Sequence, residues 1–331
     1  MNTRNQTLVN QLIGRAAVPP TALAALVGTV LVLPLLIATA VPGPSVAVPP
    51  QGLWPLAMAP AMTAFILAVH PWLQRRWQAA LDALRPLSRQ PEIVDHVVMG
   101  FRVGGWVALL LGAALAGWIS LSMRLAGWLF VYVLVTHVVM FGLLAISIYD
   151  GLRRVRHIKQ VVAAGLTLDL FDRQSLTPLA RYGQGASLTF VGGISLSLFF
   201  QSAVTLFSAV SLVTYAIMVT VALTLFFTSI WSIHTALVAA QERELAMVRR
   251  HGNGARAELQ RRLAQSAAAL GSDDARRLYE PLVVFGTYER QVLQASTWPF
   301  NPKIIKQVAA SLVAPILIYA IRVAVGLSDR F

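Results

Sequence analysis

The longest uncharged stretch of the chain runs from Tyr182 to Gln241 and contains no Asp, Glu, Lys or Arg over sixty residues. A hydrocarbon core about 30 Å thick requires about 20 helical residues at about 1.5 Å each. The stretch is therefore too long for one membrane span and suits two spans joined by a tight turn. Basic residues lie on both sides of it, Arg173 and Arg181 before and Arg243 after. This pattern predicts a helical hairpin whose two ends lie in the cytoplasm.

The composition places the whole chain in the same class. Of its 331 residues, 56% are hydrophobic and only 12% are charged, whereas soluble domains carry about 25% charged residues. This predicts an all-α, polytopic integral membrane protein. The chain has no Cys, which excludes disulfides, thiolate metal sites and Cys nucleophiles. The net charge of +13 is explained better by the positive-inside rule than by nucleic-acid binding, so no nucleic-acid partner is predicted.

The apolar segments predict seven transmembrane helices in one membrane domain, with the N-terminus inside and the C-terminus outside, at residues 21–41, 52–73, 100–123, 125–149, 185–202, 210–240 and 307–327. Residues 74–99, 150–184 and 241–306 would form a cytoplasmic layer of amphipathic helices. This arrangement places 24 of the 27 Lys and Arg residues inside, which supports the orientation. The expected location is the inner membrane of a bacterium, with the first span retained rather than cleaved as a signal peptide.

Local signals divide the cytoplasmic segments further. Pro86 and Pro91 are expected to break residues 75–98 into two short surface helices. The sixth span is expected to continue to Arg250, where the sequence His-Gly-Asn-Gly ends the helix. A second helix would follow over 255–270, and Ser272 with the two following Asp residues would cap a third helix from Ala275.

Histidines at membrane depth are the first candidates for chemistry, because ionisable groups are costly there. His137 falls near the middle of the fourth predicted span, and His70 and His234 near the inner ends of the second and sixth. Neutral His can ligate haem iron or a metal, but no HxxxH or HxxE spacing is present. A hydrogen-bonded packing role is the favoured interpretation for each, with haem or metal ligation as the alternative, and no cofactor is predicted.

Other polar residues are candidates for a pore, a cavity or a lipid contact. Arg322 in the last predicted span either snorkels to the interface or lines a permeation path, and Gln201 and Tyr215 either line a polar cavity or lie in a turn. A cytoplasmic group of six arginines either binds anionic lipid head groups or forms a solvated helix face paired with glutamates; its members are Arg243, Arg249, Arg250, Arg256, Arg261 and Arg262.

Enzyme motifs are missing from the sequence. There is no Walker A, GxGxxG, HExxH or GxSxG pattern. The spans carry no carboxylates, which argues against a proton-coupled transporter. Asp150, Asp169 and Asp172 lie near the inner interface without a metal-binding spacing, and neighbouring arginines are expected to neutralise them. These patterns favour a non-enzymatic protein.

The predicted layout resembles that of insect gustatory and odorant receptors, which also have seven spans, an inner N-terminus and long helical cytoplasmic extensions. Thr287 and Tyr288, followed after five residues by Gln294, have the spacing of that family's C-terminal signature. Glu289 and Arg290 stand where the family keeps apolar residues, and the motif precedes the last span instead of lying in it. The resemblance covers eight residues and the topology, and it implies a ligand-gated channel.

The leading hypothesis is a non-enzymatic channel-like or sensor protein, homo-oligomeric, in which the sixth span couples the bilayer to cytoplasmic helices. Its partners would be the lipid bilayer, anionic lipids and further copies of itself. An accessory or scaffold subunit of a larger membrane complex is the first alternative. A haem-binding redox subunit is the second.

Overall fold

The computed structural model describes residues 19–40, 54–95, 103–123, 125–172, 175–201, 209–265 and 272–298, and the single positions Lys306, Ala310, Val313 and Leu317. Within these ranges the fold is helical and contains no strand beyond one isolated antiparallel bridge between Ser88 and Leu166. Arg322 and nearly all of the predicted seventh span lie outside the described residues.

Among the described residues, five helices are long and apolar enough to cross a membrane, which indicates a membrane protein. They are α2 (Pro20–Ala40), α4 (Met58–Leu84), α6 (Val103–Ser122), α7 (Gly127–Ala163) and α8 (Thr177–Phe200). The predicted sixth span forms the first part of a sixth long helix, α10 (Ala209–Gln265). Seven spans and the inside–outside orientation stay predictions.

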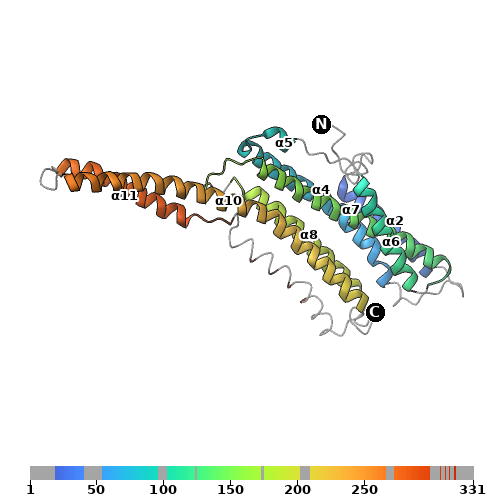
Figure 1. Cartoon of the computed structure of the whole chain (residues 1–331). Helices are drawn as coiled ribbons and strands as arrows, with labels where there is room; N and C mark the ends of the chain where they lie inside the picture. The colour runs from blue at the N-terminus through green and yellow to red at the C-terminus, as the bar shows by residue number, and fades with distance from the viewer. Residues whose placement is uncertain are drawn as a thin grey trace.

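The helices pack around a central pair, α4 and α7. Helix α6 lies along α7 and α2 lies along α4, while α8 packs on the other side of α4 and carries α10 beside it (Figure 1). Since α10 also contacts α7, α4, α7, α8 and α10 surround a common interior.

A glycine sets the close approach of α6 to α7. A Cβ atom at Gly112 would lie 2.5 Å from the carbonyl oxygen of Phe141 and 3.1 Å from the Cβ of Ala145. Small residues allow membrane helices to approach this closely and gain van der Waals contact where lipid supplies no hydrophobic drive.

The polar end of α10 differs from the sequence prediction. The helix does not end at Arg250 but continues without a break through Gly252 and Gly254 to Gln265. Glycine inside a helix costs only about 1 kcal/mol relative to Ala, and α10 gains lengthwise packing against α11 (Ser272–Gln294). The aromatic ring of Phe285 on α11 stacks on His251, with ring centroids 6.1 Å apart. Tertiary contact therefore overrides the local turn signal.

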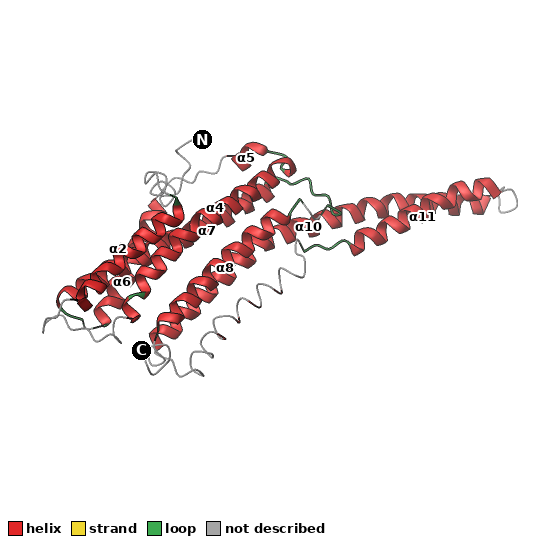
Figure 2. Ribbon diagram, turned by 180° about the vertical axis from the view of Figure 1, so that it is seen from behind, coloured by secondary structure: helices red, strands yellow, loops and turns green. Residues whose placement is uncertain are grey.

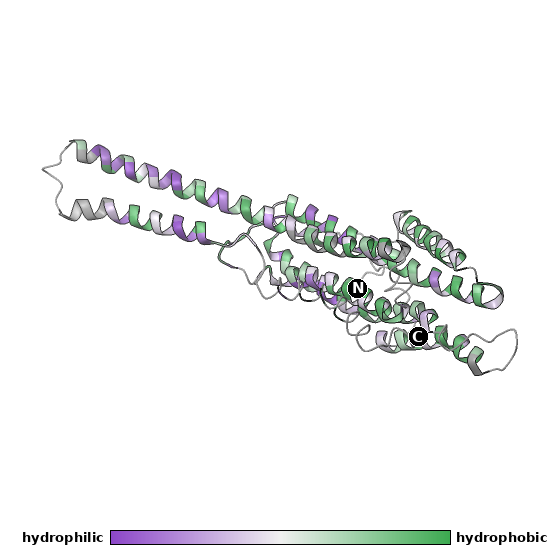
Figure 3. Cartoon of the chain, turned by 90° about the horizontal axis from the view of Figure 1, so that it is seen from below, coloured by the Kyte–Doolittle hydropathy of each residue, from purple (hydrophilic) through white to green (hydrophobic). Residues whose placement is uncertain are grey.

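Helices α10 and α11 form a two-helix hairpin that projects from the bundle, and its projecting part is markedly more hydrophilic than the bundle (Figures 1 and 3). The helix predicted over 255–270 is therefore not separate, because its residues up to Gln265 belong to α10, whereas the helix predicted from Ala275 is present as α11, which begins at Ser272. The prediction for residues 75–98 was also wrong at its start, because α4 continues unbroken to Leu84. A single 3-10 turn, η2 (Arg85–Leu87), follows, and the short helix α5 (Pro91–Asp95) begins at Pro91.

The segment after α7 is pinned to the segment after α4. Gly165, whose φ of +97° suits glycine, ends α7. Its carbonyl accepts a hydrogen bond from the N–H of Arg89 at 3.1 Å, and the N–H of Thr167 donates to the carbonyl of Leu87 at 2.8 Å. Two segments that lie about eighty residues apart in sequence are thereby joined at the base of the hairpin.

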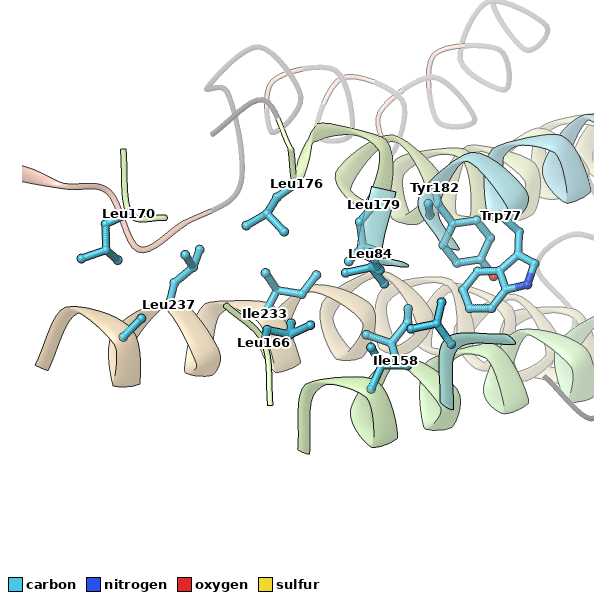
Figure 4. Packing of buried hydrophobic residues seen from close by; sticks show 14 of the residues in the cluster. Trp77, Leu84, Ile158, Leu166, Leu170, Leu176, Leu179, Tyr182, Ile233 and Leu237 are labelled. Atoms are coloured by element: carbon cyan, nitrogen blue, oxygen red, sulfur yellow. The ribbon is translucent and has the colours of Figure 1, made fainter. Parts of the chain in front are cut away.

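The largest apolar core lies at this junction rather than in the middle of the bundle. Figure 2 shows the bundle and the hairpin on either side of this junction. The core takes residues from α4, α7, the segment between α7 and α8, α8 and α10; Figure 4 labels Trp77, Leu84, Ile158, Leu166, Leu170, Leu176, Leu179, Tyr182, Ile233 and Leu237. Helix α11 adds Val292 to the same core. Trp77 and Val292 are fully buried.

Substituting Gly112 by Ala should lower the thermal unfolding temperature of the detergent-purified protein, because the added methyl group overlaps the backbone of α7; overpacking of this kind costs about 1–3 kcal/mol. Gly117 on the same helix is the matched control, since a Cβ there meets nothing within 4 Å. Circular dichroism melts of Gly112→Ala and Gly117→Ala measure the difference. Equal melting of the two variants would contradict the close packing of α6 on α7.

Candidate functional site

Two oppositely charged side chains lie one helical turn apart on α7, the partly buried Asp150 and the buried Arg154. Arg154 is only 4% exposed, and arginine is almost never buried to this degree without partners. The carboxylate of Asp150 interacts electrostatically with both Arg154 and Arg153. The pair faces α4 and α8, so three helices contribute to its surroundings.

Arg154 is held by one amide and two aromatic rings. Its Nη2 donates a hydrogen bond to Oε1 of Gln74 on α4, at 2.6 Å. The guanidinium carbon lies 5.7 Å from the ring centroid of Trp77 and 5.9 Å from that of Tyr182. Those two rings pack on each other with centroids 5.0 Å apart. A desolvated cation over aromatic faces gains about 2 kcal/mol, which helps to offset the removal of Arg154 from water.

A cavity of about 60 Å³ adjoins the charged pair. Its polar lining consists of His70, Ser147, Asp150, Arg154, Tyr182 and Thr189, and its apolar lining includes Phe65, Leu144, Phe190 and, from α10, Met218. A water molecule needs about 10–15 Å³ of such volume and a few polar partners. The cavity therefore has room for several water molecules, but not for a haem or another large cofactor.

Two charged atoms in this cavity have no hydrogen-bond partner among the residues that the structure describes, Oδ2 of Asp150 and Nε of Arg154. No ion pair joins the two side chains in the same described ranges. Nε1 of Trp77 and Nε2 of His157, whose rings meet edge to face at 6.1 Å, are also buried and unpartnered there. A buried donor or acceptor that makes no hydrogen bond costs free energy. A small polar species bound in the cavity would supply the missing hydrogen bonds, so the arrangement can bind one.

The three candidate histidines have different neighbours. His70 lines the cavity and lies in the field of Arg154. His137 is 3% exposed, and its Nδ1 lies 2.8 Å from the carbonyl oxygen of Val133. His234 stacks on Trp298 at 4.2 Å, and its Nδ1 lies 3.0 Å from the carbonyl oxygen of Thr297. The structure does not bring His70 and His234 to one site, and the contacts of His137 and His234 support the packing interpretation.

The remaining pore and cavity candidates lie elsewhere. The hydroxyl of Tyr215 on α10 is 3.1 Å from that of Ser197 on α8, so it joins two helices. Gln201 caps the end of α8 through its backbone N–H. Within the described residues no group of three His, Cys, Asp or Glu side chains is placed to hold a metal ion.

The six candidate lipid-binding arginines are distributed along the hairpin helix α10. Two of them pair with glutamates, Arg249 with Glu289 of α11 at 2.7 Å and Arg261 with Glu258 at 3.0 Å. Arg243 donates to the carbonyl of Ala239. At about 1.5 Å per residue the group extends over about 28 Å. This geometry favours the solvated helix face for Arg249 and Arg261, and lipid contact stays a prediction for the others.

The base of the hairpin carries a second set of specific contacts. Nε2 of Gln241 donates to the carbonyl oxygens of Val292 at 2.7 Å and Ala295 at 3.3 Å. Tyr288 donates to Glu244 at 3.5 Å and packs on Phe171. Burial and the neighbouring Glu244 carboxylate raise the pKa of Tyr288, so the phenol stays protonated as a donor at neutral pH. These contacts tie α11 to both α10 and the bundle.

Comparison of the chain with protein-family models, with curated proteins and with solved structures finds no match. The resemblance of Thr287, Tyr288 and Gln294 to a receptor signature therefore gains no support. The structure places those residues in α11 of the hairpin.

The sequence prediction missed the charged pair, since it expected Asp150 to be neutralised near the interface. One signal was present: Asp150 and Arg154 have the i, i+4 spacing of an ion pair directly after a long apolar run. Their burial depends on Gln74, Trp77 and Tyr182, which come from other helices.

Asp150→Asn and Arg154→Gln should each destabilise the folded protein by on the order of 2 kcal/mol, because each leaves the partner charge buried alone. The double variant should lose less than the sum of the two, since it removes both charges. Denaturant unfolding in detergent measures the cycle, with the exposed Arg156→Gln on the same helix as control. Strictly additive effects would show that the two side chains do not interact.

Proposed function

We propose that this chain is a non-enzymatic, channel-like or sensor membrane protein in which α10 couples the membrane bundle to a cytoplasmic hairpin. The observation that carries the proposal is the continuity of α10 over 57 residues. Such a helix is about 85 Å long, and a hydrocarbon core uses only about 30 Å of it. One rigid element therefore joins the interior of the bundle to the distal end of the hairpin.

Contacts of α10 inside the bundle and at the junction with the hairpin support the coupling. Inside the bundle, Met218 lines the cavity beside Asp150 and Arg154. At the junction, Ile233 and Leu237 belong to the large core, and Gln241 is bonded to the end of α11. A change in the cavity that displaces α10 is thus transmitted to the hairpin, because a packed helix moves as a unit.

Self-association is part of the proposal. The hairpin exposes large apolar side chains on one face of α11, namely Tyr279, Val283 and Leu293, each at least 45% exposed. Lipid does not cover this part of the molecule in the proposed orientation, and exposed apolar patches outside the membrane mark interaction surfaces. The occupant we propose is the same face of a second copy, which would produce a four-helix assembly.

Filling the cavity should move the hairpin. Because the chain has no Cys, spin labels can be placed at Ala79 on α4 and Ala257 on α10, both exposed. Met218→Phe should shift the distance distribution between the labels in lipid nanodiscs, whereas Ile217→Phe, at a 58% exposed neighbouring position, should leave it unchanged. An unchanged distance distribution between the labels in Met218→Phe would contradict the coupling proposal.

The assembly state should depend on the exposed face of α11. Native mass spectrometry from mild detergent should find oligomers of the unmodified chain, and Val283→Glu should convert them to monomers by placing a charge in the contact. Ala257→Glu, on exposed α10 surface, is the matched control. A monomer in several mild detergents would contradict self-association, and copurification with an unrelated chain would favour the accessory-subunit alternative.

A further inference from the structure

We propose that the cavity between α4, α7, α8 and α10 is a proton-binding site in which Oδ2 of Asp150 is the acceptor. The inference rests on the proposed function and deepens it, since it names the proton as the ligand that the sensor detects. It is carried by the unpartnered Oδ2, by the cavity that adjoins it, and by the charges that surround it.

The charge balance of the site selects the ligand. Arg154 is permanently cationic and 4% exposed, so a metal cation entering the cavity would be repelled by it. An anion entering the cavity would be repelled by the Asp150 carboxylate. The cavity of about 60 Å³ also excludes anything much larger than a few water molecules. A proton carried in by water satisfies these limits, because it forms an O–H bond on the carboxylate and removes the only negative charge in the lining.

The charged and titratable groups around Asp150 come from three helices. Helix α7 contributes Arg153 and Arg154, α4 contributes His70, and α8 contributes Tyr182. Helix α10 contributes only the uncharged Met218 to the lining. Protonation therefore removes the one negative charge that faces two arginines and raises the net positive charge of the site by one. Arg154 then has a neutral acid as its neighbour on α7, and the contacts of its guanidinium with Gln74, Trp77 and Tyr182 remain.

The position of the site connects this event to the hairpin. Trp77 and Tyr182, which flank the Arg154 guanidinium, are also members of the large junction core. A shift of Arg154 on protonation therefore acts on the same packing that holds Ile233 and Leu237 of α10. Binding of a proton at Asp150 and displacement of α10 are linked through two aromatic side chains.

Infrared difference spectroscopy tests the site directly on the full chain in nanodiscs. Acidification should produce a carboxylic-acid C=O band at the high wavenumber typical of a carboxyl group shielded from water, and this band should shift in heavy water. The band should be lost in Asp150→Asn, retained at a shifted position in Asp150→Glu, and unchanged in Asp82→Asn, an exposed carboxylate of α4. Absence of the band in the unmodified protein, or its persistence in a folded Asp150→Asn variant, would overturn the proposal.

The spin-label pair at Ala79 and Ala257 tests the consequence. Acidification should shift the distance distribution in the unmodified protein, and Asp150→Asn should hold it at the acidic position in both buffers. A distribution insensitive to pH would overturn the proton as the signal. If Met218→Phe still shifts the labels in that case, the coupling function stands while the proton proposal fails, so the two are distinguishable.

Discussion

The packing of Trp77 against Tyr182 is the contact on which the rest of the structure depends. These two side chains are essentially inaccessible to solvent and meet ring to ring where α4, α7 and α8 converge. On one side they cover the Arg154 guanidinium, and on the other they begin the apolar core that anchors α10 and α11. Inside a membrane, apolar surface alone gives helices little reason to associate. A large interlocking aromatic pair supplies shape-specific contact instead.

This arrangement explains why a buried arginine is tolerated at the end of the bundle that adjoins the hairpin. Gln74 provides one hydrogen bond and the two rings provide cation–π contact, while Asp150 balances the charge across a cavity large enough for water. Each compensation alone is worth less than the cost of burying an ion. The rings of Trp77 and Tyr182 contact the Arg154 guanidinium and also belong to the apolar core. A change in charge at Arg154 therefore acts directly on the packing of that core.

The sequence predicts the five membrane-length helices that the structure describes, since length and hydropathy suffice where the backbone must satisfy its own hydrogen bonds. The Tyr182–Gln241 stretch does divide into two long helices, α8 and α10. The sequence does not predict where α10 ends. The glycines after His251 indicate a helix end locally, but the stacking of His251 on Phe285 comes from another helix and no local pattern reveals it. The site was missed for a similar reason. Arg154 meets Gln74 across eighty residues of sequence, and no pattern within α7 reveals that partner.

The uninterrupted α10 makes the hairpin a lever arm. From Gln241 to the end of α10 at Gln265 the helix extends about 36 Å beyond the junction core at about 1.5 Å per residue. A tilt of about 5° at the junction, which side-chain repacking can accommodate, would carry its distal end through about 3 Å by simple geometry on that length. A small tilt at the junction core is thereby magnified into a displacement comparable to the gap between neighbouring side chains.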